Sequence, residues 1–94
     1  MRFAYIIMGD FGSGTNRAEI ANGGAVMLGV SDIAEAVIRA RELADSGIGC
    51  IELCGAFGES GAKAIIEATE NKITVGYVTH LPEQNDIYTS VFGE

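Results

Sequence analysis

Basic residues are scarce in this sequence. Six lysines and arginines stand against thirteen aspartates and glutamates, so the formal net charge at pH 7 is −7, and the few bases form no patch or stripe. Proteins that bind nucleic acid gather positive charge on one surface, and an anionic membrane surface repels a chain as acidic as this one. We therefore expect neither nucleic acid nor a membrane as a partner.

Long hydrophobic runs are also missing. No apolar stretch approaches the roughly 20 residues that span a bilayer. The N-terminal segment Met1–Asp10 carries a single base, and its apolar run of six residues is followed at once by Gly-Asp. This pattern fits a short strand better than an export signal. We therefore expect a cytoplasmic protein.

Cysteine is limited to two residues, Cys50 and Cys54. On an extended strand this spacing separates their Cα atoms by roughly 13 Å, whereas a disulfide requires about 7 Å or less. Without further cysteine or histidine at a matching spacing, the pair is not a zinc signature. The sequence predicts two reduced thiols.

The rest of the composition is that of a packed domain. The chain has 94 residues, of which 48% are hydrophobic, and one proline. This length fits a single α/β domain over residues 1–94, with much of its surface left in water. Apolar segments rich in β-branched and aromatic residues predict strands, and apolar residues at helical spacing predict helices. We expect strands at residues 2–8, 25–30, 48–53 and 73–78, and helices at residues 31–46 and 59–70.

The first predicted helix has the clearest ends. Asp32 and Glu35 have the spacing of a capping box, with Ser31 as the alternative N-cap. Gly47 stands where a residue of left-handed conformation usually ends a helix. Glu35 and Arg39 are four residues apart, so we expect them to form an ion pair on the exposed side of the helix.

Two further segments carry local signals. Asn22-Gly23 is a strong hairpin signal because both residues tolerate a positive φ, and it predicts a short edge strand before residues 25–30. Near the C-terminus, Pro82 suits the first position of a helix, and the apolar residues that follow have helical spacing. The same residues are also compatible with a strand, so the C-terminal element is expected to be a short helix or a strand.

Together these elements predict an α/β fold. Its β-α-β-α-β core has a small, mainly parallel sheet, preceded by an extra N-terminal strand. If the core strands lie in sequential order, both helices cover the same face of the sheet. The opposite face then needs a cover, because parallel sheets are not left with one face in water. The first strand, the C-terminal segment or another copy of the chain can supply that cover, and we predict a homo-oligomer.

Polar residues gather at the expected carboxyl ends of the strands, where α/β proteins bind their ligands. Asp10 follows the first strand, Glu52 and Cys54 end the third, and His80, the only histidine, follows the last. A carboxylate in a buried strand is costly unless it is paired, and such burial prepares a general acid/base or a ligand contact. Glu52 is thus the leading catalytic candidate. The alternative is an ion pair with Arg2, with Arg17 or with a partner chain at an interface.

Cys54 and His80 are the other catalytic candidates. Cys54 precedes a predicted helix, whose N-terminal N–H groups can activate a thiol, or it packs as a small apolar residue. His80 can act as a base for Cys54, as a metal ligand, as an anion contact or as a solvated loop residue. No spacing motif supports a metal site formed by these residues with Asp10 and Glu52.

Glycines and one arginine are the ligand-binding candidates beside Asp10. Gly55 and Gly58 precede the helix predicted at 59–70, whose N-terminus attracts anions, although Glu59 opposes them. Arg17 can hold a carboxylate or phosphate, or it forms a surface ion pair. The glycine-rich loop at 9–16 lacks the ending of a P-loop and the third glycine of the dinucleotide fingerprint. The sequence therefore specifies no cofactor.

Three segments of the chain, Phe3–Asp10, Ile51–Gly58 and Gly76–Pro82, carry a family resemblance. Together they resemble a small prokaryotic family of stand-alone α/β proteins of about this length, catalogued as a domain of unknown function. The motif Glu-Leu-Cys-Gly-x-Phe-Gly within Ile51–Gly58 is its most specific part. The resemblance implies an intracellular, independently folding protein and supplies no activity.

Three functions remain as hypotheses. The first is a small oligomeric protein that binds a small polar or anionic metabolite at the carboxyl ends of the strands. The second is a small enzyme that uses Glu52 as acid/base, or Cys54 as a thiolate with His80. The third is a structural assembly module. The first hypothesis ranks ahead because it requires the fewest coincidences.

Overall fold

The computed structural model describes residues 1–12 and 16–93. In these residues five strands form one sheet, which is accompanied by three α-helices. In chain order the elements are β1 (Phe3–Met8), β2 (Arg17–Ile20), β3 (Ala25–Val30), α1 (Ile33–Asp45), β4 (Cys50–Leu53), the 3-10 turn η1 (Gly55–Phe57), α2 (Gly58–Ala68), β5 (Thr74–Tyr77), the 3-10 turn η2 (Pro82–Gln84) and α3 (Asn85–Phe92). None of the helices described is long and apolar enough to cross a membrane.

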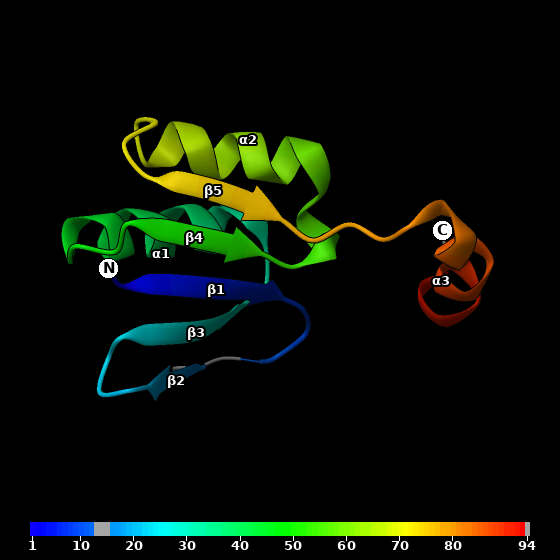
Figure 1. Cartoon of the computed structure of the whole chain (residues 1–94), viewed down its shortest axis with the longest axis horizontal. Helices are drawn as coiled ribbons and strands as arrows, with labels where there is room; N and C mark the ends of the chain where they lie inside the picture. The colour runs from blue at the N-terminus through cyan, green and yellow to red at the C-terminus, as the bar shows by residue number, and fades with distance from the viewer. Residues whose placement is uncertain (13–15, 94) are drawn as a thin grey trace.

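The sheet has the order β2-β3-β1-β4-β5 (Figure 1). β1, β3, β4 and β5 are parallel, and only β2 is antiparallel to its neighbour, β3. The predicted α/β class with a mainly parallel sheet is therefore confirmed. The strand order is not sequential, because β1 lies between β3 and β4. In that position β1 hydrogen-bonds on both sides, and its residues Ala4 and Ile6 are fully buried.

The predicted edge strand is confirmed as β2, which forms a hairpin with β3. The turn between them uses three consecutive residues at positive φ, namely Ala21 (55°), Asn22 (55°) and Gly23 (95°). Asn and Gly are the residues that adopt this conformation most readily, which explains why this hairpin is visible in the sequence.

The N-cap predicted for α1 is confirmed at Asp32, whereas the Glu35 carboxylate reaches one residue beyond the N–H that a capping box would use. The Asp32 carboxylate accepts a hydrogen bond from the Glu35 N–H at 2.8 Å, and the Glu35 carboxylate accepts one from the Ser31 N–H at 2.8 Å. Gly47 follows the helix with a φ of 97°, as the C-terminal signal requires. These contacts fix both ends of α1, which connects β3 to β4.

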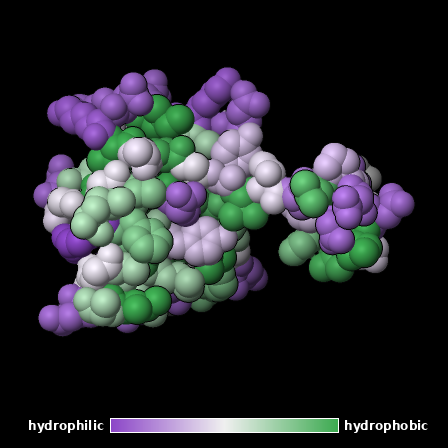
Figure 2. Space-filling model, viewed as in Figure 1, coloured by the Kyte–Doolittle hydropathy of each residue, from purple (hydrophilic) through white to green (hydrophobic). Residues whose placement is uncertain are grey.

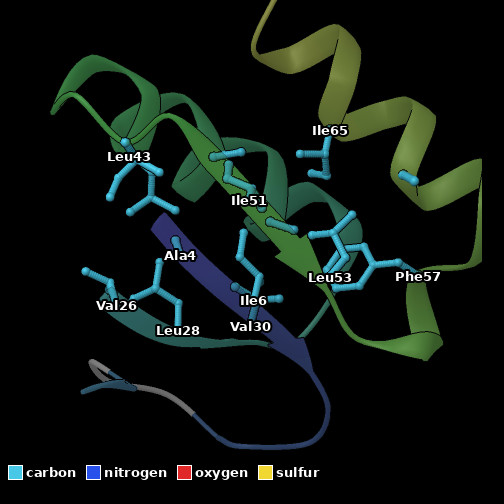
Figure 3. Packing of buried hydrophobic residues seen from close by; sticks show 14 residues of the cluster. Ala4, Ile6, Val26, Leu28, Val30, Leu43, Ile51, Leu53, Phe57 and Ile65 are labelled. Carbon is cyan, nitrogen blue, oxygen red and sulfur yellow. The ribbon is translucent and has the colours of Figure 1, made fainter. Parts of the chain in front are cut away.

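α1 and α2 pack side by side on one face of the sheet and form the hydrophobic core with it. Figure 3 shows the side chains of β1, β3 and β4 pointing toward these two helices. Ile6, Ile51, Leu53 and Ile65 are each 0% exposed. Phe57 fills the space that Gly61 of α2 leaves free, since a Cβ at Gly61 would lie only 2.9 Å from the Phe57 Cβ.

Among residues 1–12 and 16–93, no helix lies on the opposite face of the sheet, which we call the open face. Residues on a strand alternate between the two faces, so each strand that buries one set of residues presents the other set here. Figure 2 views this side of the molecule and shows it mostly apolar. Its strand residues are Phe3, Tyr5, Ile7, Ala18, Ile20, Ala25, Met27, Gly29, Cys50, Glu52, Thr74 and Gly76, and Phe11 lies over Gly29.

The chain after β5, residues 78–93, forms a C-terminal arm. It runs on from the end of β5 and carries α3 beyond the carboxyl ends of the strands (Figure 1). A helix or a strand was predicted here, and the structure has a helix, α3. Pro82 begins the 3-10 turn that precedes it. Neither the first strand nor this arm covers the open face, so two of the three covers considered for it are wrong.

Candidate functional site

Glu52 lies on the open face of β4, and its side chain is exposed. The expectation that it is buried is wrong, because β4 is covered on only one of its faces. The Glu52 carboxylate occupies the space above Gly76, where its Oε1 lies 2.8 Å from the position that a Cβ would take. Its Oε2 accepts a hydrogen bond from the Cys50 thiol at 3.5 Å.

Cys54 lies immediately after β4 and before η1. Its Sγ accepts a hydrogen bond from the Met8 N–H at 3.3 Å, so the thiol joins the ends of β4 and β1. The side chain is half-buried and packs against the hydrophobic core. Cys54 thus belongs to the helix-covered side of the sheet, whereas Glu52 belongs to the open face.

His80 lies in the C-terminal arm and contacts other residues of the arm. Its Nε2 is 2.8 Å from Asn85 Oδ1, and its ring stacks on Tyr88 with the ring centroids 4.3 Å apart. These contacts fix the orientation of α3 relative to the end of β5. They engage one ring nitrogen and one ring face of His80 within the arm.

The three catalytic candidates therefore lie in three different settings. In the part of the chain that the structure describes, no hydrogen bond joins Glu52, Cys54 and His80 to one another. The same residues contain no group of three or more side chains able to hold a metal ion. The catalytic assignments stay predictions, and the structure supplies no geometry that links them.

The loop candidates also lie apart. Asp10 is exposed after β1, and residues 13–15 of the predicted glycine-rich loop lie outside the described residues. Gly55 faces the arm, because a Cβ there would lie 3.4 Å from the Val78 carbonyl oxygen and 3.8 Å from the Tyr88 hydroxyl. Gly58 begins α2 with a φ of 61°.

A cavity of about 380 Å³ lies between α1 and the β2–β3 side of the sheet. We call it the arginine groove. It is lined by Arg2, Asn16, Arg17, Leu28, Gly29, Glu35, Arg39, Glu42, Leu43 and Ser46. Its volume falls within the range of small-molecule sites. Of its three arginines, only Arg17 was predicted from the sequence as a ligand contact, because only folding brings Arg2, Arg17 and Arg39 to one cavity.

Each arginine of the groove already has partners. Arg17 donates to Glu19 Oε2 from Nε at 3.0 Å and from Nη2 at 2.9 Å. Arg39 pairs with Glu42, and the predicted pair with Glu35 is wrong because the Glu35 carboxylate caps α1.

Arg2 is held differently from the other two arginines. Its Nε donates to the Gly23 carbonyl at 3.0 Å and its Nη1 to the Ser46 carbonyl at 2.8 Å. Both partners are neutral, and no carboxylate among the described residues forms an ion pair with Arg2. Its guanidinium is therefore bound by carbonyl oxygens and engaged by no carboxylate in an ion pair.

The groove concentrates the positive charge of an acidic protein. Three of the six basic residues of the chain line it, together with Glu35 and Glu42, and Glu19 pairs with Arg17 at its edge, although the whole chain carries a net charge of −7. Guanidinium groups bind carboxylates and phosphates through two parallel hydrogen bonds. The arrangement is chemically suited to holding a small anion.

Comparison with known proteins identifies the family of the chain. Neither the curated proteins nor the solved structures gave a match. A family model does match, over residues 1–93, and its description assigns no activity. The chain therefore belongs to DUF6506, a family of unknown function.

Proposed function

We propose that this protein is a cytoplasmic homo-oligomer that binds a small anionic metabolite, with the carboxylate or phosphate of the ligand in the arginine groove. The observation that carries the proposal is the collection of half of the basic residues of an acidic chain around one cavity of about 380 Å³. The proposal keeps the anionic ligand expected from the sequence and moves its main contacts from the strand ends to the side of α1.

The existing ion pairs do not prevent binding. Arg17 with Glu19 and Arg39 with Glu42 are exposed pairs, and such pairs contribute about 0–1 kcal/mol each. A ligand anion can replace either glutamate at little cost. Arg2 needs no exchange, because its partners are carbonyl oxygens and its charge is free to attract the ligand.

Two other features support the remaining parts of the proposal. Cys50 and Cys54 are both free thiols, which fits a reducing compartment such as the cytoplasm. The uncovered apolar face of the sheet supports self-association, because large exposed apolar patches mark interaction surfaces. The enzyme hypothesis, with Glu52, Cys54 and His80, has no comparable support.

Titration of the ¹⁵N-labelled protein with inorganic phosphate and with succinate, followed by amide NMR shifts, tests the groove. We expect shifts that centre on Gly29 and Ser46, which line it. The double variant Arg17→Gln/Arg39→Gln should weaken binding by roughly tenfold or more, since it removes two charged donors. Shifts that do not reach the groove, or that persist unchanged in the double variant, would contradict the proposal.

Arg41→Gln is the matched control. Arg41 belongs to the same helix as Arg39 but lines a different hollow, where Lys72 is balanced by Asp45 and Glu70. It removes one positive charge, as each of the single variants Arg17→Gln and Arg39→Gln does, without touching the arginine groove. We expect this variant to bind both anions as the wild type does.

A further inference from the structure

Two separate surfaces carry most of the exposed hydrophobic side chains. Among the described residues, twelve large hydrophobic side chains are exposed, and nine of them lie on the open face or in the C-terminal arm. Those of the open face are Phe3, Phe11, Ile20 and Met27, and those of the arm are Val78, Leu81, Ile87, Val91 and Phe92. An apolar sheet face and an apolar helix in one chain thus both lack a partner.

The solvent-accessible surface of the chain is larger than that of a compact monomer, because these two apolar surfaces are uncovered. It measures 6094 Å². A compact monomer of this mass is expected to expose about 5,200 Å². The radius of gyration is 13.6 Å, against roughly 12.4 Å for a compact chain of this length. The chain therefore exposes about 900 Å² more than a closed monomer would.

The arm presents a defined apolar strip. Ile87 and Val91 are one helical turn apart on α3 and are 59% and 66% exposed. Tyr88 is engaged by His80 on one side and by Phe92, whose ring centroid is 4.8 Å away, on the other. The side of α3 that bears Ile87 and Val91 therefore remains free for another partner.

The open face contains a matching hollow. A largely apolar cavity of about 250 Å³ is lined by Ile7, Phe11, Asn16, Arg17, Ala18, Met27 and Gly29. Gly29 has no side chain, so the floor of this hollow is partly the backbone of β3. It is the kind of depression into which the apolar side chains of a docking helix insert.

We propose that the arm of one copy packs on the open face of a second copy, and that the exchange is reciprocal. The Ile87–Val91 strip of each α3 then covers the β1–β3 region of the partner's sheet around Met27. This deepens the homo-oligomer part of the proposed function. The hollow shares Asn16, Arg17 and Gly29 with the arginine groove but none of the groove residues of α1. In such a two-fold dimer each arm–face contact occurs twice.

A second copy suits the geometry better than the same chain does. The chain runs on from β5 past the strand ends, and the Tyr88 hydroxyl of α3 approaches Gly55 there. Folding back onto its own open face would require the chain to reverse direction between β5 and α3 and would separate Tyr88 from Gly55. Two copies with about 900 Å² of excess surface each would bury about 1,800 Å² together, which is the size of a standard interface.

Sedimentation velocity over a wide range of protein concentration, with three variants of the full chain, tests the exchange. Ile87→Glu/Val91→Glu disables the arm, Met27→Glu disables the open face, and Ile38→Glu is the control. All four positions are already exposed, so each variant is expected to fold, and Ile38 lies on the outer side of α1 away from both surfaces. We expect the arm and face variants to weaken self-association on the order of a hundredfold, and the control to leave it unchanged.

Mixing the two disabled proteins distinguishes exchange from other assemblies. The arm variant retains an intact face, and the face variant retains an intact arm, so the mixture should form a heterodimer with one working contact. That heterodimer should be weaker than the wild-type dimer and stronger than either variant alone.

Three results would overturn the proposal. A wild type that stays monomeric at every concentration would place the arm on its own sheet or leave it free, and it would also remove the homo-oligomer from the proposed function. An oligomer that Ile87→Glu/Val91→Glu leaves intact would retain the homo-oligomer and exclude the arm as its contact. Disabled proteins that never associate when mixed would exclude exchange.

Discussion

Single side chains decide where the elements of this fold begin and end. Asp32 caps α1 by accepting from the Glu35 N–H, and the Glu35 carboxylate accepts from the Ser31 N–H. Asn22 and Gly23 supply, with Ala21, the positive φ values of the hairpin turn. At the end of α2, hydrogen bonding to Lys72 and the charge of its ammonium group hold the pKa of Glu70 below its usual value. Both side chains of this pair are exposed, so the pair contributes little to stability. The ends of the elements are therefore set by helix caps and turns.

Replacement of the α1 cap should destabilise the protein measurably. Asp32→Ala leaves the Glu35 N–H without its acceptor, which at an N-cap costs about 1 kcal/mol of the free energy of unfolding. Urea denaturation followed by circular dichroism measures the difference. Asp45→Ala, in the last turn of the same helix, removes an equal charge from the unfavourable end of the helix dipole and should not destabilise. Equal losses in the two variants would contradict this account of the cap.

Glu52 shows how far a single residue could be interpreted from the sequence. The run Ile48–Leu53 is apolar almost throughout, so it predicts a strand covered on both faces and a buried carboxylate. In the structure Ile51 and Leu53 are buried, whereas Glu52 is exposed on the open face. The alternation was present in the sequence, but the missing cover is a property of the whole sheet that no local pattern reveals.

At the scale of elements, the helices and most strands could be predicted because their signals are local. The order of the strands could not be predicted. β1 lies between β3 and β4, and that position depends on how the connection through α1 places β4 in the sheet, which no local pattern encodes. The arginine groove was missed for the same reason. The three arginines are far apart in the sequence: Arg2 lies just before β1, Arg17 begins β2 and Arg39 belongs to α1. Only the fold brings them to one cavity.

The two isoleucines of α2 test how this helix contributes to the core. Ile65 is 0% exposed, whereas its neighbour Ile66 is half-buried. Ile65→Ala should lower the free energy of unfolding by about 2–5 kcal/mol, because it leaves a cavity between α2 and the sheet. Ile66→Ala should cost clearly less. Denaturant unfolding of both variants measures the difference, and a larger loss at Ile66 would show that α2 packs in another orientation.

At the scale of the whole molecule, the distribution of apolar surface is uneven. One face of the sheet is sealed by α1 and α2, while the other face and the C-terminal arm remain in water (Figures 1 and 2). A parallel sheet with an uncovered apolar face is not expected to persist as an isolated monomer. The central claim is therefore that the functional unit contains more than one copy of the chain.

Small-angle X-ray scattering of the wild-type protein tests this claim most directly, because it reports mass and size together. We predict a scattering mass of at least twice 9.8 kDa and a radius of gyration larger than the 13.6 Å of the single chain. A mass of 9.8 kDa at every concentration would contradict the claim. A radius of gyration near 12.4 Å at that mass would show that the arm closes on its own sheet.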